Sequence, residues 1–188
     1  MNKKNLIVSS GNINKIKEIK DILSDLNINV LSKDEIGLKN LDVIEDGNTL
    51  EDNAIKKAVE ISKYTDGIVI SDDSGLFVDK LNEEPGVYSA RYSGEEGNDN
   101  ANNVKLLKNL EGVPLEERTA KFKTAIAIVL EDKSIKTVVG DCSGKIIWEK
   151  RGDNGFGYDP LFIPDGYDKT FGELDSKIKI VLVIEQML

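Results

Sequence analysis

The sequence predicts an α/β fold built on a long mixed sheet with flanking helices. In the first half, two apolar strand-like runs, 4–9 and 68–70, alternate with segments of helical periodicity. In the second half, two longer β-rich runs flank a short charged turn, as in an antiparallel hairpin. The 188 residues contain no internal repeat or low-complexity linker, so we expect a single domain, or two closely packed lobes, over 1–188.

The first half is expected to open with a strand, a loop and a helix. Residues 4–9 predict the buried strand, and apolar side chains at helical spacing between 16 and 26 predict the helix. A second helix is predicted to begin after Thr49 as its N-cap and to end at Gly67, directly before the strand at 68–70. The expected apolar face of this helix consists of Leu50, Ala54, Ala58 and Ile61.

The second half is expected to contain one more helix and several strands. The helix is predicted at about 100–110, with Gly112 as its stop signal. The runs 121–130 and 134–141 are rich in β-branched residues and predict the two strands of a hairpin. Residues 146–148 predict a further strand, and a glycine-dense loop follows it.

The residue types exclude several classes of catalysis. The chain contains no histidine and a single cysteine, Cys142. These counts exclude Ser-His-Asp and Cys-His catalysis, histidine-bound zinc, a CxxC motif and an intrachain disulfide. Acid–base or metal chemistry must therefore come from carboxylates, lysines, tyrosines or water.

The net charge of −9 argues against a nucleic-acid polymer as partner, because a phosphate backbone is bound by a basic surface. Apolar stretches such as 124–130 are far too short to span a bilayer, and the amino terminus lacks the layout of a signal peptide. We therefore expect a cytoplasmic protein with no membrane partner. A small phosphorylated substrate is compatible with this charge, since a divalent cation and a few lysines can neutralise it locally.

A candidate phosphate-binding loop lies between the first strand and the first helix. Glycine lets the backbone approach a ligand, the start of a helix offers free N–H groups to an anion, and a lysine adds a positive charge. The alternative is an ordinary strand-to-helix turn, because the segment is not a Walker sequence. The segment consists of Ser10, Gly11, Asn12, Ile13, Asn14 and Lys15.

A candidate metal site follows the apolar run 68–70. Asp72 and Asp73 are adjacent carboxylates, followed by Ser74 and Gly75. Carboxylates at the end of a strand are costly to desolvate unless a cation or a donor satisfies them. Oxygen ligands of this kind suit Mg²⁺, which shares phosphate oxygens with its substrate. The alternative is a solvated turn.

A third segment of interest is the glycine-dense run 155–160. It sets Phe156 and Tyr158 between glycines and follows them with Asp159. An aromatic ring in such a loop can present a flat face to a nucleobase, and a carboxylate can accept hydrogen bonds from ring N–H groups. The alternative is a β-turn with a packed aromatic side chain.

Taken together, these segments resemble the inosine triphosphate pyrophosphatase family. The resemblance runs from Ile7 to about Lys179 and is specific because five segments occur in the family's order. The matching segments are 10–15 with Glu18, 72–76, 85–94, 155–162, and Thr170 and Phe171 with Glu173 and Leu174.

The resemblance implies an elongated mixed α/β structure with two lobes around a central cleft, commonly as a homodimer. It implies hydrolysis of ITP, dITP and XTP at the α-phosphorus, dependent on Mg²⁺ or Mn²⁺, with release of the monophosphate and pyrophosphate. Asp73 matches the family's general base and, together with Glu45, its metal ligands. The implied substrate contacts are Ser10, Gly11, Asn12, Ile13, Asn14, Lys15, Lys57, Ser74, Phe156, Gly157, Tyr158, Asp159 and Lys179.

The tail at 180–188 departs from the family pattern. In the family, a Ser-His-Arg segment that contacts the purine C6 oxygen follows shortly after the position of Lys179, whereas this chain reads IVLVIEQML. One coding sequence permitted for these nine residues reads Asn-Ser-Ile-Ser-His-Arg-Ala-Asn-Val after a one-base shift. A frameshift and a divergent natural tail are therefore both open. We expect weak, poorly selective hydrolysis, and burial of the apolar run 180–184.

Two other interpretations of function stay open at this point. The first is a nucleotide-binding protein of the same fold whose turnover is impaired by the missing Ser-His-Arg segment. The second is another nucleotide hydrolase of similar fold, such as the Maf-like group, which lacks this set of segments. An enzyme releases pyrophosphate when Mg²⁺ is present, whereas a binding protein shows only ligand-dependent stabilisation.

Overall fold

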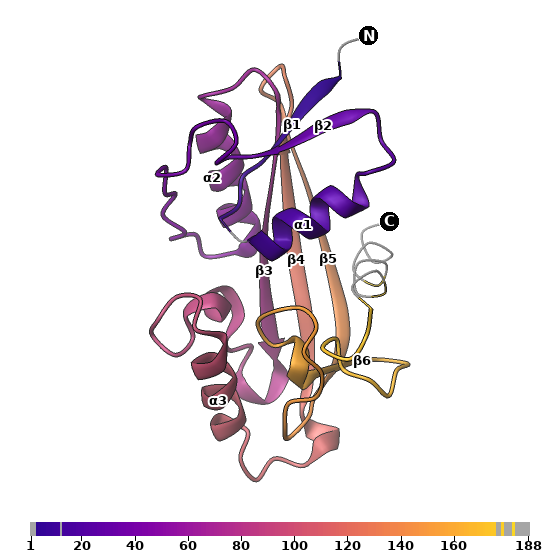
Figure 1. Cartoon of the computed structure of the whole chain (residues 1–188). Coiled ribbons are helices and arrows are strands. Elements are labelled where there is room, and N and C mark those ends of the chain that lie inside the picture. The colour runs from indigo at the N-terminus through magenta and orange to yellow at the C-terminus, as the bar shows by residue number, and fades with distance from the viewer. Residues whose placement is uncertain (1–2, 12, 176–177, 179–181, 183–188) are drawn as a thin grey trace. The chain divides into compact units, whose positions relative to one another are not determined.

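The computed structural model describes residues 3–11, 13–175, 178 and 182 of the chain (Figure 1). The chain divides into two compact units. The first unit contains Met1–Asp73 and Ala125–Val139, and the second contains Ser74–Thr124 and Gly140–Leu188. Each of the three unit boundaries falls inside a long strand.

The strands form a six-stranded sheet in the order β2-β1-β3-β4-β5-β6. β1 is parallel to both β2 and β3, whereas β5 and β6 are antiparallel, so the sheet is mixed. This arrangement confirms the α/β fold expected from the sequence, and the neighbouring strands β4 and β5 confirm the hairpin. The strands are Lys4–Val8 (β1), Ile28–Ser32 (β2), Ile68–Val78 (β3), Thr119–Val129 (β4), Ile135–Ile146 (β5) and Phe162–Pro164 (β6).

The sheet is accompanied by the α-helices Ile13–Ile22 (α1), Leu50–Ser62 (α2) and Asp99–Asn109 (α3). Short 3₁₀ turns occupy Asp79–Leu81, Gly86–Arg91, Leu115–Glu117 and Asp159–Leu161. Among the residues that the structure describes, none of these helices has the length and apolar character needed to cross a membrane.

The core of the first unit lies between β1, β3 and α2. Thr49 caps α2 as predicted, because its side-chain oxygen accepts a hydrogen bond from the backbone N–H of Asp52 at 3.0 Å. The predicted apolar face is also confirmed, since all four of its members are buried. On the strand side the core includes Leu6, Ile7, Val8 and Val69.

The role of Gly67 differs from the predicted one. α2 already ends at Ser62, five positions before this glycine, with Lys63 as its C-cap. A Cβ atom at Gly67 would lie 2.6 Å from Ile7 Cδ1 and 3.0 Å from the carbonyl oxygen of Asn5. Gly67 is therefore required because β3 enters the sheet against β1 at this point, and the end of the helix is set elsewhere.

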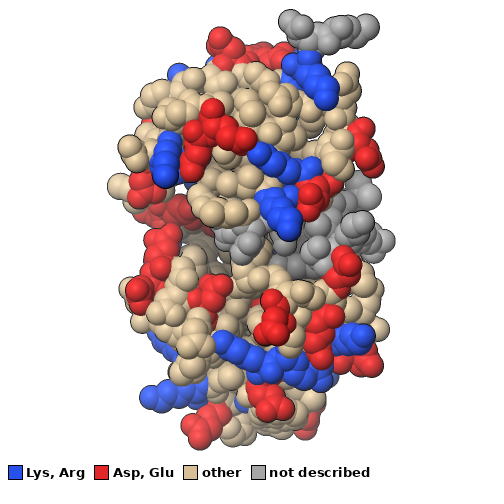
Figure 2. Space-filling model, viewed as in Figure 1, with Lys and Arg blue, Asp and Glu red and all other residues tan. Residues whose placement is uncertain are grey.

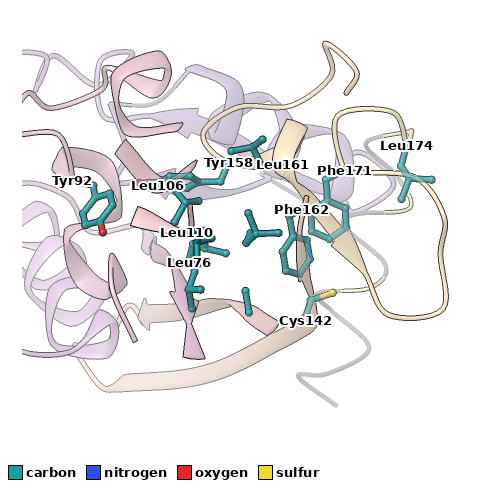
Figure 3. Packing of buried hydrophobic residues seen from close by; sticks show 13 residues of the cluster. Leu76, Tyr92, Leu106, Leu110, Cys142, Tyr158, Leu161, Phe162, Phe171 and Leu174 are labelled. Atoms are coloured by element: carbon teal, nitrogen blue, oxygen red, sulfur yellow. The ribbon is translucent and has the colours of Figure 1, made fainter. Parts of the chain in front are cut away.

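The core of the second unit is rich in aromatic rings. Phe162 and Phe171 lie beside each other, with ring centroids 5.2 Å apart (Figure 3). Phe122 packs edge-on against Phe162, with ring centroids 4.8 Å apart. Leu106 of α3 and Leu110, the C-cap of this helix, are fully buried in the same cluster. Aromatic pairs in edge-to-face or offset arrangements stabilise a core beyond what the burial of their apolar surface contributes.

The strand predicted at 146–148 is not present, because Ile146 is the last residue of β5. Ile147 then donates its backbone N–H to the carbonyl of Leu161 at 2.9 Å, which leads the chain toward the glycine-dense loop. The sequence pattern suggested a separate strand because Ile146 and Ile147 are both apolar, but Ile146 is the end of the longer strand β5 and Ile147 follows it.

The expected burial of the apolar run 180–184 can be compared with the structure at Leu182. Leu182 is partly buried and packs against the core of the second unit, as does Ile178 before it. This agrees with the expected burial of 180–184 at the residue that is described. The other residues of that run lie outside the described part of the chain, as does Lys179.

Candidate active site

Asp72 and Asp73 lie inside a strand, and the prediction that they follow its end is wrong. β3 continues to Val78, well beyond the apolar run 68–70. β1 pairs with β3 only as far as Ile70, so the acidic residues occupy the stretch of β3 beyond that pairing. Because side chains alternate along a strand, Asp73 is buried while Asp72 is only half-buried.

Asp73 belongs to an ion cluster within the first unit. Lys57, on α2, places its Nζ 3.1 Å from Glu45 Oε1 and 3.5 Å from Asp73 Oδ1. The Lys57 side chain is 13% exposed and the Asp73 side chain 12%, whereas Glu45 is more open at 30%. Two carboxylates that are distant in sequence therefore converge on one ammonium group. Coulombic attraction in such a shielded position exceeds that of an exposed pair.

The segment before α2, which carries Glu45, is fastened to this helix at several points. Asp46 is paired with Lys56, and this hydrogen bond lowers the pKa of the Asp46 carboxyl. The backbone N–H of Gly47 donates to Asn53 Oδ1 at 2.8 Å. Asn53 Nδ2 donates in turn to Asp73 Oδ2 at 3.0 Å. Helix α2 thus holds both carboxylates of the cluster.

The predicted phosphate loop begins next to the same helix. Ser9 donates its hydroxyl to the carbonyl of Lys57 at 3.2 Å, and its N–H to the carbonyl of Ile70 at 2.8 Å. Ser10 is half-buried, Gly11 is exposed, and Ile13 begins α1 with its side chain 80% exposed. Asn12 lies outside the described residues, and so do the side chains of Asn14 and Lys15, whose backbones belong to α1.

The glycine-dense loop belongs to the second unit, where its polar groups hold its own backbone. Asp159, 1% exposed, accepts a hydrogen bond from the N–H of Phe156 at 2.9 Å. A Cβ atom at Gly155 would lie 2.0 Å from Asp159 Oδ2, so only glycine permits this turn. Gly157 is held from α3, since its N–H donates to Asp99 and its carbonyl accepts from Asn103.

Tyr158 is also committed to the interior of the second unit. The Tyr158 side chain belongs to the buried cluster of Figure 3 and is 3% exposed. Its hydroxyl donates to the carbonyl of Ser89 at 2.8 Å. Burial raises the pKa of this hydroxyl, which keeps it protonated as a donor. Only Phe156 and Gly157 of the predicted base-binding residues are half-exposed. Ser74 bonds within the same unit, with its Oγ 3.0 Å from Thr124 Oγ1.

Comparison with known proteins identifies the family to which these segments belong. A model of the Ham1 family matches residues 6–182, nearly the whole chain. The chain belongs to the Ham1 family. Among its relatives, the dITP/XTP pyrophosphatase of Clostridium perfringens is 50% identical over 183 residues, which cover 94% of this chain and 89% of the relative. The dITP/XTP pyrophosphatase of Bacillus subtilis is 46% identical and covers 94% of this chain and 88% of the relative.

Solved structures of Ham1 proteins share the fold. The Ham1 protein of Staphylococcus aureus superimposes with a TM-score of 0.84 at 39% identity, covering 98% of this chain and 94% of that protein. The HAM1 protein of Coxiella burnetii gives a TM-score of 0.85 at 34% identity, with coverages of 98% and 93%. The resemblance inferred from five short segments is therefore confirmed for family and fold.

The carboxylates of Glu45 and Asp73 suit a divalent cation such as Mg²⁺. In the part of the chain that the structure describes, no group of three or more His, Cys, Asp or Glu side chains is placed to hold a metal ion. Glu45 and Asp73 nevertheless face a common cation, the Lys57 ammonium, which marks the space between them as favourable for positive charge. Mg²⁺ commonly takes one or two carboxylates and completes its shell with water and phosphate oxygens, so this donor set fits.

Sequence reasoning missed Asn53, which lies on α2 one turn before Lys57. The sequence contained a signal for this residue. Asparagine is disfavoured in helix interiors, and Asn53 places a polar side chain within the apolar face of α2. Cys142, in contrast, has no place in the chemistry. Burial raises the pKa of its thiol to about 11, so the nucleophilic thiolate is scarce at neutral pH.

Proposed function

We propose that this chain hydrolyses ITP, dITP and XTP to the corresponding monophosphate and pyrophosphate, with dependence on Mg²⁺ or Mn²⁺. The observation that carries the proposal is the convergence of Glu45, Lys57 and Asp73 in a member of the Ham1 family. Relatives named dITP/XTP pyrophosphatase favour this activity over a binding protein with impaired turnover. The absence of histidine is compatible with it, since the groups proposed for the phosphate chemistry are carboxylate oxygens and lysine nitrogens.

In this mechanism Asp73 acts as the general base. Its Oδ2 is held by Asn53 Nδ2 and its Oδ1 faces Lys57 Nζ, so the orientation of the carboxylate is fixed. A fixed carboxylate can align a water molecule and accept its proton as the water attacks the α-phosphorus. Lys57 offsets negative charge that grows on the phosphate oxygens during the attack. Glu45 and Asp73 would hold the metal ion, which neutralises the leaving pyrophosphate when bound.

Each candidate loop, taken within its own unit, offers further groups for the proposed substrate. Ser10 to Lys15 would bind the triphosphate, because the loop leads into the start of α1. Phe156 would offer its half-exposed ring to the base, with Lys179 and Ser74 as further contacts. We also propose a homodimer located in the cytoplasm, to be tested by light scattering and fractionation. Figure 2 supports a small nucleotide over a nucleic-acid polymer, because basic and acidic side chains are intermixed on the face in view.

A nucleotide panel tests the proposal directly. Pyrophosphate release is measured with ITP, dITP, XTP, ATP and GTP, each with Mg²⁺, with Mn²⁺ and with excess chelator. We expect release from ITP, dITP and XTP with either ion and loss of release with chelator. Inorganic phosphate as the sole product, or full activity in chelator, contradicts the proposal. Thermal stabilisation by nucleotide without turnover would instead support the binding protein.

A further inference from the structure

Asn53 makes two hydrogen bonds that join both carboxylate-bearing segments of the site. It is fully buried, with an exposed fraction of 0%, on the first turns of α2. Its Oδ1 accepts from the N–H of Gly47, two residues after Glu45, and its Nδ2 donates to Asp73 Oδ2. A single short side chain therefore bridges the Glu45 segment and β3.

The chemistry of the two partners fixes the orientation of this amide. A backbone N–H can only donate, so Oδ1 must face Gly47, and an ionised carboxylate can only accept, so Nδ2 must face Asp73. No other side chain of similar size offers a donor and an acceptor in this arrangement without bringing a charge. A leucine or an alanine here would leave the Gly47 N–H and one oxygen of Asp73 without these partners, at a cost in a buried place.

Lys57 and Asn53 contribute differently to the cluster. The ammonium of Lys57 sits on a long flexible stem and contacts the carboxylates at 3.1 and 3.5 Å. The amide of Asn53 has two rotatable bonds and makes shorter contacts of 2.8 and 3.0 Å. Lys57 therefore supplies charge, whereas the rigid amide of Asn53 restricts where Asp73 and the Glu45 segment can lie.

We propose that Asn53 is a positioning residue of the active site. It holds Asp73 and the segment of Glu45 in the relative positions that the reaction requires. The inference rests on the proposed pyrophosphatase function, because it assigns to Asn53 a role exerted through the general base. Outer partners of this type change metal affinity or activity by about 10–100-fold when they are removed. Their effect falls on kcat, since a misplaced base lowers the rate after the substrate has bound.

The decisive variant is Asn53→Asp. It keeps the volume of the side chain and the acceptor for Gly47, but it replaces the donor to Asp73 with a second carboxyl oxygen. If the new group is ionised it repels Asp73, and if it is protonated it shares its proton with Asp73. In the first case Asp73 is displaced from its position, and in the second its basic oxygen is engaged by the shared proton. We therefore expect kcat to fall about 100-fold with the KM for ITP almost unchanged.

Asn102 on α3 offers a matched control in the second unit, since it is 2% exposed and its amide also accepts from a backbone N–H and donates to an oxygen. Its Oδ1 accepts from the N–H of Ser93 at 2.7 Å and its Nδ2 donates to the carbonyl of Ala90 at 3.2 Å. Asn102→Asp should lower the melting temperature about as much as Asn53→Asp, yet retain kcat. An Asn53→Asp variant that retains kcat, or that loses activity only in proportion to its unfolded fraction, overturns the proposal.

A second readout does not depend on turnover. Mn²⁺ is titrated without nucleotide and followed by electron paramagnetic resonance in the unchanged chain, Asn53→Ala and Asn102→Ala. We expect Asn53→Ala to weaken Mn²⁺ binding at least about 10-fold and Asn102→Ala to leave it unchanged. If the unchanged chain binds Mn²⁺ but releases no pyrophosphate, the proposed function fails while this positioning role is still measured. Equal Mn²⁺ affinity in all three proteins overturns the positioning role by itself.

Discussion

Asp73 and Asp159 are both buried carboxylates in segments that match the family pattern, but their hydrogen-bond and ion-pair partners differ. Asp73 contacts Asn53 and Lys57, which lie on another element and include a cation. Asp159 accepts the backbone N–H of Phe156, three residues before it in the same loop. The contacts of Asp73 orient its carboxylate in the way that the proposed mechanism requires, whereas the contact of Asp159 with Phe156 stabilises a turn. If the proposed mechanism holds, a segment that matches the family pattern can supply a catalytic carboxylate or a contact that stabilises its own loop.

The largest effect that would test this comparison is expected at Asp73. Asp73→Asn should lower kcat by about 10²–10⁴-fold, because it removes the general base while preserving the volume of the side chain. Steady-state pyrophosphate release measures the loss, and a thermal melt shows whether the fold is intact. Asp141→Asn is a suitable control, since Asp141 is an exposed carboxylate paired with Lys121 on a strand. Near-normal turnover in Asp73→Asn would place the base elsewhere.

The tail gives the next largest expected effect. Replacing 180–188 by Asn-Ser-Ile-Ser-His-Arg-Ala-Asn-Val restores the family's donors and keeps an apolar side chain at 182, where Leu182 packs on the core. Each buried hydrogen bond regained is worth about 1–3 kcal/mol, so we expect the ratio of kcat/KM for ITP over ATP to rise about 10–100-fold. The control is the same graft without Ile184→His and Glu185→Arg. A strong preference for ITP in the unchanged chain would show that other residues read the base.

A smaller effect is expected at Phe156, whose half-exposed ring is the member of the glycine loop best placed to meet a base. Stacking of a base on an aromatic ring contributes about 1–3 kcal/mol, so Phe156→Ala should raise the KM for ITP roughly 10-fold with kcat little changed. Initial rates over a range of ITP concentrations separate the two constants. An unchanged KM would assign Phe156 to the structure of the loop.

These expectations also show what the sequence could and could not predict. Thr49 and the apolar face of α2 were readable because capping and helical periodicity act within a few residues. The spacing of Glu45, Lys57 and Asp73 in the sequence did not predict that they converge, because their convergence depends on how α2 packs on β3. Only the family resemblance marked these three residues as candidates. Asn53 was missed altogether, because its importance lies in two partners that folding brings to it.

The smallest kinetic effect is expected at Tyr158. Family resemblance assigns this residue to the base pocket, yet its ring lies in the core of the second unit and its hydroxyl donates to the carbonyl of Ser89. Tyr158→Phe keeps the ring and removes that hydrogen bond, so we expect a loss of about 1 kcal/mol in the free energy of unfolding, with kcat and KM unchanged. Urea denaturation and ITP kinetics on the same preparation measure both. A raised KM with unchanged stability would mean that the hydroxyl contacts the substrate. Tyr158 of the glycine-dense loop would then bind the base in addition to packing in the core.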